Sequence, residues 1–321
     1  MPGLRTILVP FNNAQPTAPA VKAAKKLAEA EGAYIEGAYC RQVLPIIAGE
    51  GITLPGDYLA EFEEEGRHQA ALARTHFESL AAEMGIPMSD LAGQGLRAGW
   101  TEMMGTGPEG IGEYARAFGI SVLHRDIQSS SMDWKSTAEA LLFESGRPLL
   151  LVSNDIPDTI GRRILVAWNG SIETARALSA ARPLLASCEA LQVLSVQGGM
   201  TSGPDVDLIT AHLKASGFRA ESNSRDSAGT TVGQVIVDEA SAFGADLIIK
   251  GAFTHSRLRQ LVFGGATSEI FNHASCPVIS AIRRVKGCLS FSESILNGDQ
   301  RLREWGICRL QKSIMRGSFG P

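Results

Sequence analysis

The sequence lacks the features that would place the protein in or across a membrane. It has no run of about 18 consecutive apolar residues, which is the length a membrane-spanning helix needs. Its first residues, MPGLRTILVPF, do not follow the basic-then-apolar order of a signal peptide. We therefore expect a cytoplasmic protein without a membrane partner.

The sequence also lacks the usual signatures of metal, redox, nucleic-acid and hydrolytic sites. Its five cysteines are scattered and include no C-x-x-C pair. Aromatic residues make up 6% of the chain, the formal net charge is −4, and no basic run contains interleaved aromatics, so we expect no nucleic-acid partner. The patterns G-x-S-x-G, H-E-x-x-H and G-x-x-x-x-G-K-[ST] are absent. No catalytic residue and no metal ligand is predicted from these patterns.

What the chain does contain is typical of a folded globular protein. It has 321 residues, of which 44% are hydrophobic and 20% charged. This length exceeds what one hydrophobic core usually serves, which favours two domains.

An internal repeat supports the two-domain interpretation. Residues 5–40 and 162–197 each begin with a basic residue, continue with I-L-V, reach an Asn and pass through an alanine-rich segment to a second apolar run. Residues 139–153 and 268–282 also correspond, since each gives a helical stretch, a turn, a proline and a closing apolar run. Short uninterrupted apolar runs are typical of strands buried on both faces of a parallel sheet.

The repeat predicts an α/β protein with two tandem doubly wound parallel-sheet domains, residues 1–153 and 162–284, joined by the linker NDIPDTIG. The first domain carries extra length, in which residues 61–85 are predicted to form a long charged helix after an exposed flap rich in glycine and proline. Residues 285–321 match neither repeat and carry six Lys or Arg against three Asp or Glu. This tail contains one candidate helix, at 300–315, and is a docking segment, a disordered extension or sequence unrelated to the repeats.

The segment KGAFTHSRLRQLVFGGATSEI, residues 250–270, contains two adjacent glycines before a predicted helix. Simple turn chemistry is one explanation, because glycine is favoured wherever the chain turns tightly. A phosphate cradle of free backbone N–H groups at a helix start is the other. Ligands of open parallel sheets bind outside the carboxyl ends of the strands, and AWNGS, Val196 and Gly251 each follow or end such a strand.

The spacing in this segment resembles the nucleotide loop of the universal stress protein family, which has Gly, two residues, Gly, nine residues, then Gly with Ser or Thr. The matching residues here are Gly251, Thr254 and Gly264, followed by Gly265. The opening ILVAWNGS and the closing HASCPVI are similar to the first and last strands of the same family. The resemblance covers nearly all of residues 162–282, and the two-domain layout is similar to a tandem member, with a Rossmann-like fold of the adenine nucleotide alpha hydrolase type.

The resemblance implies a stress-response module that binds ATP or a related adenine nucleotide in the second domain, with Mg²⁺ as an accompanying ion. It places adenine near Val196 and phosphates against residues 264–267. We expect slow ATP hydrolysis at most, because the sequence shows no assigned general base or metal-binding carboxylate near the loop. The nucleotide-binding positions that it implies are Ala167, Asn169, Val196, Gly251, Thr254, Gly264, Gly265, Ala266 and Thr267.

Three positions depart from the family pattern. Asn169 replaces an acidic residue and contributes no charge for a metal ion or ribose. Thr254 brings a Cβ where the family has its second glycine, and Gly265 replaces a hydroxyl residue, for which Thr267 partly compensates.

Basic residues in the same loop favour phosphate binding. His255 and Arg257 lie close to the predicted phosphate position, and arginine is a good bidentate partner for phosphate. The first domain instead has PFNNAQ after its first strand and no glycine between Gly119 and Gly146, so we expect it to be degenerate and to hold no phosphate.

Two other classes of function stay open at this point. One is a nucleotide-independent scaffold that associates through its closing strands, within the chain or as a homodimer. The other is an adenylate-using enzyme such as a nucleotide transferase, for which His255 is the only candidate catalytic group.

Overall fold

The computed structural model describes residues 4–11, 18–43, 56–126, 133–252 and 265–282. The predicted flap, the predicted tail helix and most of the glycine-containing loop lie outside these ranges.

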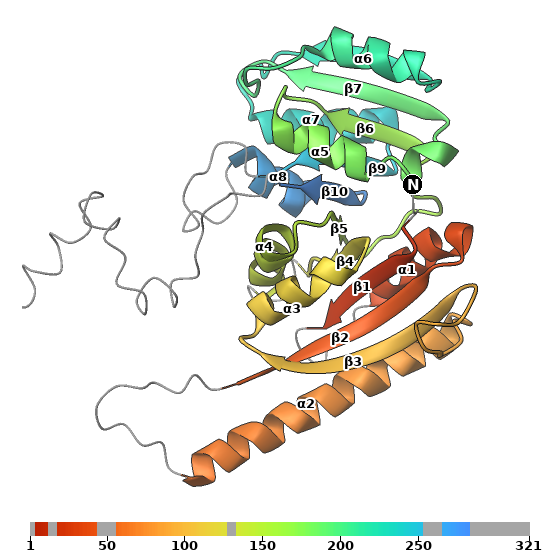
Figure 1. The fold of residues 1–321 in the computed structure, drawn as a ribbon. Coiled ribbons are helices and arrows are strands. Elements are labelled where there is room, and N and C mark those ends of the chain that lie inside the picture. Colours follow the sequence, from red (N-terminus) through yellow and green to blue (C-terminus); the bar gives the residue numbers. More distant parts are fainter. Residues whose placement is uncertain (1–3, 12–17, 44–55, 127–132, 253–264, 283–321) are drawn as a thin grey trace, which may run out of the picture. The chain divides into compact units, whose positions relative to one another are not determined.

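The strands of the described residues form one ten-stranded sheet (Figure 1). They are β1 (Thr6–Phe11), β2 (Tyr34–Gln42), β3 (Arg97–Gly105), β4 (Ile120–His124), β5 (Leu149–Val152), β6 (Arg163–Ala167), β7 (Ala190–Val196), β8 (Ala220–Arg225), β9 (Leu247–Gly251) and β10 (Val278–Ala281).

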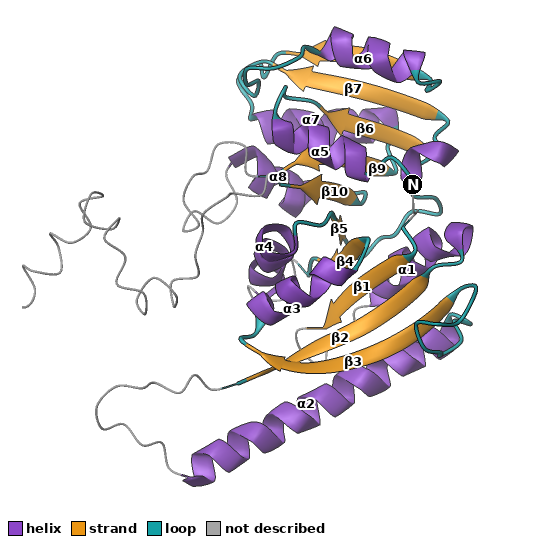
Figure 2. Ribbon diagram, viewed as in Figure 1, coloured by secondary structure: helices purple, strands orange, loops and turns teal. Residues whose placement is uncertain are grey.

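Helices alternate with these strands along the chain, as the repeat predicts (Figure 2). They are α1 (Ala18–Glu31), α2 (Gly56–Glu83), α3 (Pro108–Tyr114), α4 (Asp133–Ser145), α5 (Ile172–Ala180), α6 (Val206–Ala215), α7 (Val232–Phe243) and α8 (Gly265–His273), with short 3-10 turns at Ala115–Ala117 and Leu184–Ser187.

The strand order is β3-β2-β1-β4-β5-β10-β9-β6-β7-β8. Every neighbouring pair is parallel except β5 with β10, which is antiparallel. Each half of the chain therefore gives a doubly wound parallel sheet of the predicted class, and the two halves meet through their closing strands. The domain boundaries themselves stay a prediction.

The α2 helix begins earlier than expected, at Gly56 instead of residue 61, and ends at Glu83. Asp57 in its first turn is favourable at a helix N-terminus, where the helix dipole attracts negative charge. The prediction used the charged run alone and so missed the first turn.

Two hydrophobic clusters form the core, one on each face of the sheet. The first contains side chains from α1, α2, α5 and α6, and the second contains side chains from α3, α4, α7 and α8. Successive residues of a strand point to opposite faces, so Ile7 belongs to the first cluster and Leu8 to the second.

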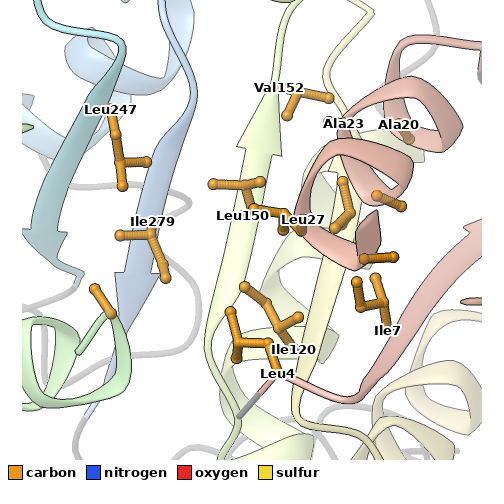
Figure 3. Packing of buried hydrophobic residues seen from close by; sticks show 14 of the residues in the cluster. Leu4, Ile7, Ala20, Ala23, Leu27, Ile120, Leu150, Val152, Leu247 and Ile279 are labelled. Carbon is orange, nitrogen blue, oxygen red and sulfur yellow. The ribbon is translucent and has the colours of Figure 1, made fainter. Parts of the chain in front are cut away.

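The first cluster continues across the junction of the two halves (Figure 3). Leu150 and Val152 of β5 belong to the same cluster as Ile279 of β10 and Leu247 of β9, and all four side chains are fully buried. The two halves therefore share a core as well as a sheet.

The linker between the halves is fixed by one buried carboxylate. Asp246, at the start of β9, is 8% exposed and accepts hydrogen bonds from the Thr159 hydroxyl at 2.6 Å and from the backbone N–H of Gly161 at 3.0 Å. It also accepts from the N–H groups of Arg162 at 3.1 Å and Arg163 at 3.0 Å. Both oxygens are thus occupied by donors from the segment that leads into β6.

Among the described residues, none of the helices combines the length and the apolar character needed to cross a membrane.

An Asp246→Asn variant should lose about 3 kcal/mol of unfolding free energy, because one acceptor oxygen becomes an amide facing buried donors. Urea denaturation of the full chain measures this. The control is Asp238→Asn on α7, whose exposed carboxylate accepts one bond from Gln234 and whose loss should change stability by less than about 0.5 kcal/mol. Equal effects of the two substitutions would contradict the role of Asp246.

Candidate functional site

The candidate site lies where the strand order of the second half reverses. β6 has β7 on one side and β9 on the other, and Ala167 at the end of β6 is the register partner of Lys250 in β9. Gly251 follows at the end of β9, beside Ala281 of β10. The carboxyl ends that the sequence placed together therefore lie side by side, at the position where open α/β sheets bind ligands.

Asn169 is engaged within the loop that leads from β6 to α5. Its Oδ1 accepts from the Ser171 backbone N–H at 3.2 Å and from the Thr174 hydroxyl at 2.7 Å. Ser171 caps α5 and accepts from the Thr174 N–H at 3.2 Å. The side-chain oxygen of Asn169 thus helps to start a helix.

The loop after β7 is fastened to the loop after β6. The Asn169 carbonyl accepts from both the N–H and the hydroxyl of Thr201, at 2.8 and 3.0 Å. The Trp168 indole donates to the Pro204 carbonyl at 2.8 Å. Gly170 has φ of 80°, and a Cβ there would lie 2.9 Å from the Thr201 oxygen, so this position requires glycine. These contacts give the site a fixed wall.

Ala167 and Val196 contribute buried side chains, which are 5% and 3% exposed and belong to the second cluster. The Val196 carbonyl accepts from the Gly199 N–H at 3.1 Å. At the strand ends, these two residues therefore present mainly their backbone groups.

Gly251 serves the packing of α5. A Cβ on Gly251 would lie 2.4 Å from the Thr174 nitrogen and 2.6 Å from the Glu173 carbonyl carbon. No side chain fits in that space, because the first turn of α5 already fills it. The packing of α5 alone therefore requires glycine at this position, without reference to a ligand.

Gly265 differs from Gly251 in this respect. It is the exposed first residue of α8, and a Cβ built on it meets no atom of the described residues within 4 Å. Ala266, next in the helix, is half-buried, and its carbonyl faces Gly233 of α7. The described residues therefore place no side chain or backbone against Gly265 at the first turn of α8. The predicted residues Thr254, His255, Arg257 and Gly264 lie outside the described ranges.

Lys250 is a site residue that the sequence reasoning missed. Its side chain is 9% exposed, and its Nζ donates to the Thr267 hydroxyl at 2.9 Å and to the Gly251 carbonyl at 2.9 Å. Burial lowers the pKa of Lys250 to about 8. Thr267, itself 6% exposed, is thereby tied to β9. A single lysine in the apolar run LIIKG was the available signal.

Arg125, which follows β4 in the first half, reaches the other end of the same helix. It is 5% exposed, and its guanidinium donates to the carbonyl oxygens of Phe271 and Ala274. Burial lowers the pKa of Arg125 to about 10. α8 is therefore held at its first turn by β9 and at its last turn by the other half.

In the described part of the chain, no three His, Cys, Asp or Glu side chains gather in a way that could hold a metal ion.

A sequence profile of the universal stress protein family matches residues 161–280. The match runs from the residues before β6 into β10 and includes the predicted site positions and Lys250, but not Arg125 of the first half. Residues 161–280 are a universal stress protein domain. Among curated proteins, none matches the chain.

Solved structures extend the likeness in fold to the first half. A universal stress protein from Archaeoglobus fulgidus is 15% identical, with a TM-score of 0.61, over 88% of this chain and 97% of that chain. A functionally unknown protein from Pseudomonas aeruginosa is 14% identical, with a TM-score of 0.51, over 87% of this chain and 92% of that chain. At such identities the likeness concerns the fold alone.

The two glycines of the universal stress protein domain should respond oppositely to substitution. Gly251→Ala should cost about 2 kcal/mol or more, because the added methyl overlaps the α5 backbone. Gly265→Ala should be neutral or add about 0.5 kcal/mol, since alanine is the better helix former and meets open space. Urea unfolding of both variants checks this, and a large loss in Gly265→Ala would contradict it.

The burial of Lys250 predicts a pH-dependent stability difference. With a folded pKa of about 8 against an ordinary 10.5, the unfolded chain binds more protons between these values. The cost of the buried charge is therefore full below pH 8 and disappears as the pH rises toward 10.5.

A Lys250→Met variant should gain stability relative to the wild type as the pH falls from 10 to 7, by up to about 3 kcal/mol. Unfolding measured at several pH values gives this difference. Lys214→Met, at an exposed position of α6, should show no such trend. A pH-independent difference for Lys250→Met would show that the ammonium is not buried.

Proposed function

We propose that the protein is a cytoplasmic stress-response module that binds ATP or a related adenine nucleotide in its second half and does not turn it over efficiently. Phosphates lie against the first turn of α8, and the adenosine part lies toward the ends of β6 and β7. The family membership of residues 161–280 supports the assignment.

The observation that carries the proposal is the hydrogen bond between Lys250 and Thr267. It holds the first turn of α8 beside the carboxyl end of β9, with Ala167 of β6 next to it. The first N–H groups of a helix have no partner within the helix, and they favour an anion together with the helix dipole. Gly265 leaves open space at that turn.

The remaining groups fit a nucleotide better than a free metal ion. A buried cation and a glycine at a helix start suit phosphate oxygens. Asn169 uses its side-chain oxygen within the protein, and the described residues offer no acidic cluster for Mg²⁺. An ion that accompanies the nucleotide would therefore be held chiefly by the phosphates. This set of side chains supports nucleotide binding without efficient catalysis.

The mechanism we propose is a population shift of α8. A ligand that contacts the first turn favours one position of this helix, and Arg125 links its last turn to the first half. Ligand binding in one half thereby changes the surface of the other.

One observation favours the scaffold as the alternative function. β5 and β10 pair within the chain, with Val278, Ile279 and Ser280 opposite Leu151, Leu150 and Leu149. Within the described sheet this leaves β3 and β8 as edges that another chain could join.

Calorimetric titration of ATP into the full chain tests the proposal. The wild type should bind one nucleotide per chain. Gly265→Leu should fold normally, because its side chain starts in open space, but weaken ATP binding at least about tenfold by filling the space for phosphate.

Ile172→Ala is the matched control, since it changes an exposed side chain at the first residue of α5 and should keep wild-type affinity. Absence of binding to the wild type at millimolar ATP would overturn the nucleotide proposal in favour of the scaffold. Stoichiometric product formation within minutes would instead indicate an enzyme.

A further inference from the structure

Lys250 is buried at a place where a lysine side chain is costly. It lies in the strand interior of LIIKG, on the face that α7 and α8 cover, because its neighbour Ile248 belongs to the cluster on that face. The side chain is 9% exposed. Lysines are almost never buried to this degree unless they are paired with an opposite charge.

Lys250 has no such pair among the described residues. Its two acceptors, the Thr267 hydroxyl and the Gly251 carbonyl, are both neutral. An ammonium has three N–H donors, so one of them has no acceptor among the described residues. The nearby carboxylates face elsewhere: Glu173 packs with α5 against Gly251, on the opposite face of the sheet, and Glu269 packs against Gly233 of α7.

A second polar group beside Lys250 has no hydrogen-bond partner among the residues that the structure describes. Ser280 of β10 is the register partner of Lys250, and its hydroxyl is fully buried without a hydrogen bond. Strand alternation places it on the same face as Val278, which belongs to the α7 and α8 side. The junction of β9, β10 and the first turn of α8 thus holds unused hydrogen-bonding capacity.

The helix dipole adds to the energetic cost of the charged Lys250 side chain. The N-terminus of α8 carries partial positive charge, and Thr267 on its first turn is the residue that Lys250 contacts. Burial and dipole both disfavour an ammonium there, and an anion at the same turn reverses both effects.

We propose that Lys250 is a ligand-binding residue whose ammonium donates to a phosphate oxygen at the first turn of α8, so that this site selects ligands carrying a polyphosphate. The inference rests on the proposed nucleotide site and assigns its charge selectivity to a residue outside the glycine spacing.

A purely structural lysine would behave differently. If the side chain only held α8 against β9, its removal would lower stability and leave ligand preference unchanged. If it binds phosphate, its removal abolishes the preference for phosphorylated ligands in a protein that still folds.

The test compares ATP, adenosine and inorganic tripolyphosphate by calorimetry at pH 7 with the wild type, Lys250→Met and Lys250→Gln. Glutamine keeps a hydrogen-bond donor toward Thr267 but carries no charge. The Lys250→Gln variant can therefore be used for the measurement if Lys250→Met folds poorly. Lys214→Met on α6 is the control for loss of one positive charge. Loss of Lys250 should lower the affinity for ATP and for tripolyphosphate at least about tenfold and leave the affinity for adenosine unchanged.

The outcomes separate the inference from the proposed function. Wild-type affinity for ATP in both Lys250 variants would overturn the role of Lys250 and keep the nucleotide site. Binding of tripolyphosphate that depends on Lys250, without any ATP binding, would keep the role of Lys250 and overturn the nucleotide site. No binding of either phosphate ligand to the wild type would overturn both.

Proton uptake gives a second readout. Because burial lowers the pKa of Lys250 to about 8, a bound anion should raise it again and draw in protons at pH 8. Titrations in buffers of different ionisation enthalpy should show this uptake for the wild type and not for Lys250→Gln, and equal uptake by both would contradict the inference.

Discussion

The antiparallel pairing of β5 with β10 is the interaction on which the arrangement of the two halves depends. Each of these strands closes its own parallel sheet, and an unpaired closing strand would expose a row of backbone N–H and C=O groups. Pairing satisfies both rows at once and brings Leu150 and Ile279 into one core. The sheet thereby becomes continuous, and its described edges are the two distant strands β3 and β8.

The same junction connects the first half to the helix of the candidate site. Arg125 places a cation at the C-terminus of α8, where the helix dipole and the last carbonyl groups favour it. Lys250 places a second cation near the N-terminus of the same helix, where the dipole opposes it. Among the described residues, α8 therefore has a favourable charge at its C-terminus and an unfavourable one at its N-terminus, which is the arrangement that the proposed anionic ligand would balance.

The sequence made β1, β6 and β9 predictable because strands buried on both faces are continuous apolar runs. It did not reveal β8, AESNSR, since four of its six residues are exposed and an edge strand needs little apolar character. In the site, the glycine spacing pointed to the segment before α8, and α8 begins at Gly265. The spacing could not reveal that α5 fills the space at Gly251, because that contact comes from a helix far earlier in the chain, Ile172–Ala180.

Lys250 shows why spacing and chemistry must be considered separately. A family pattern records where glycine is required, and here the packing of α5 explains Gly251 without any ligand. The burial of an ammonium beside neutral acceptors has no comparable explanation within the described residues, because folding alone would favour an apolar side chain at that position. The unpaired charge is therefore stronger physical support for an anionic ligand than the glycine pattern that first indicated one.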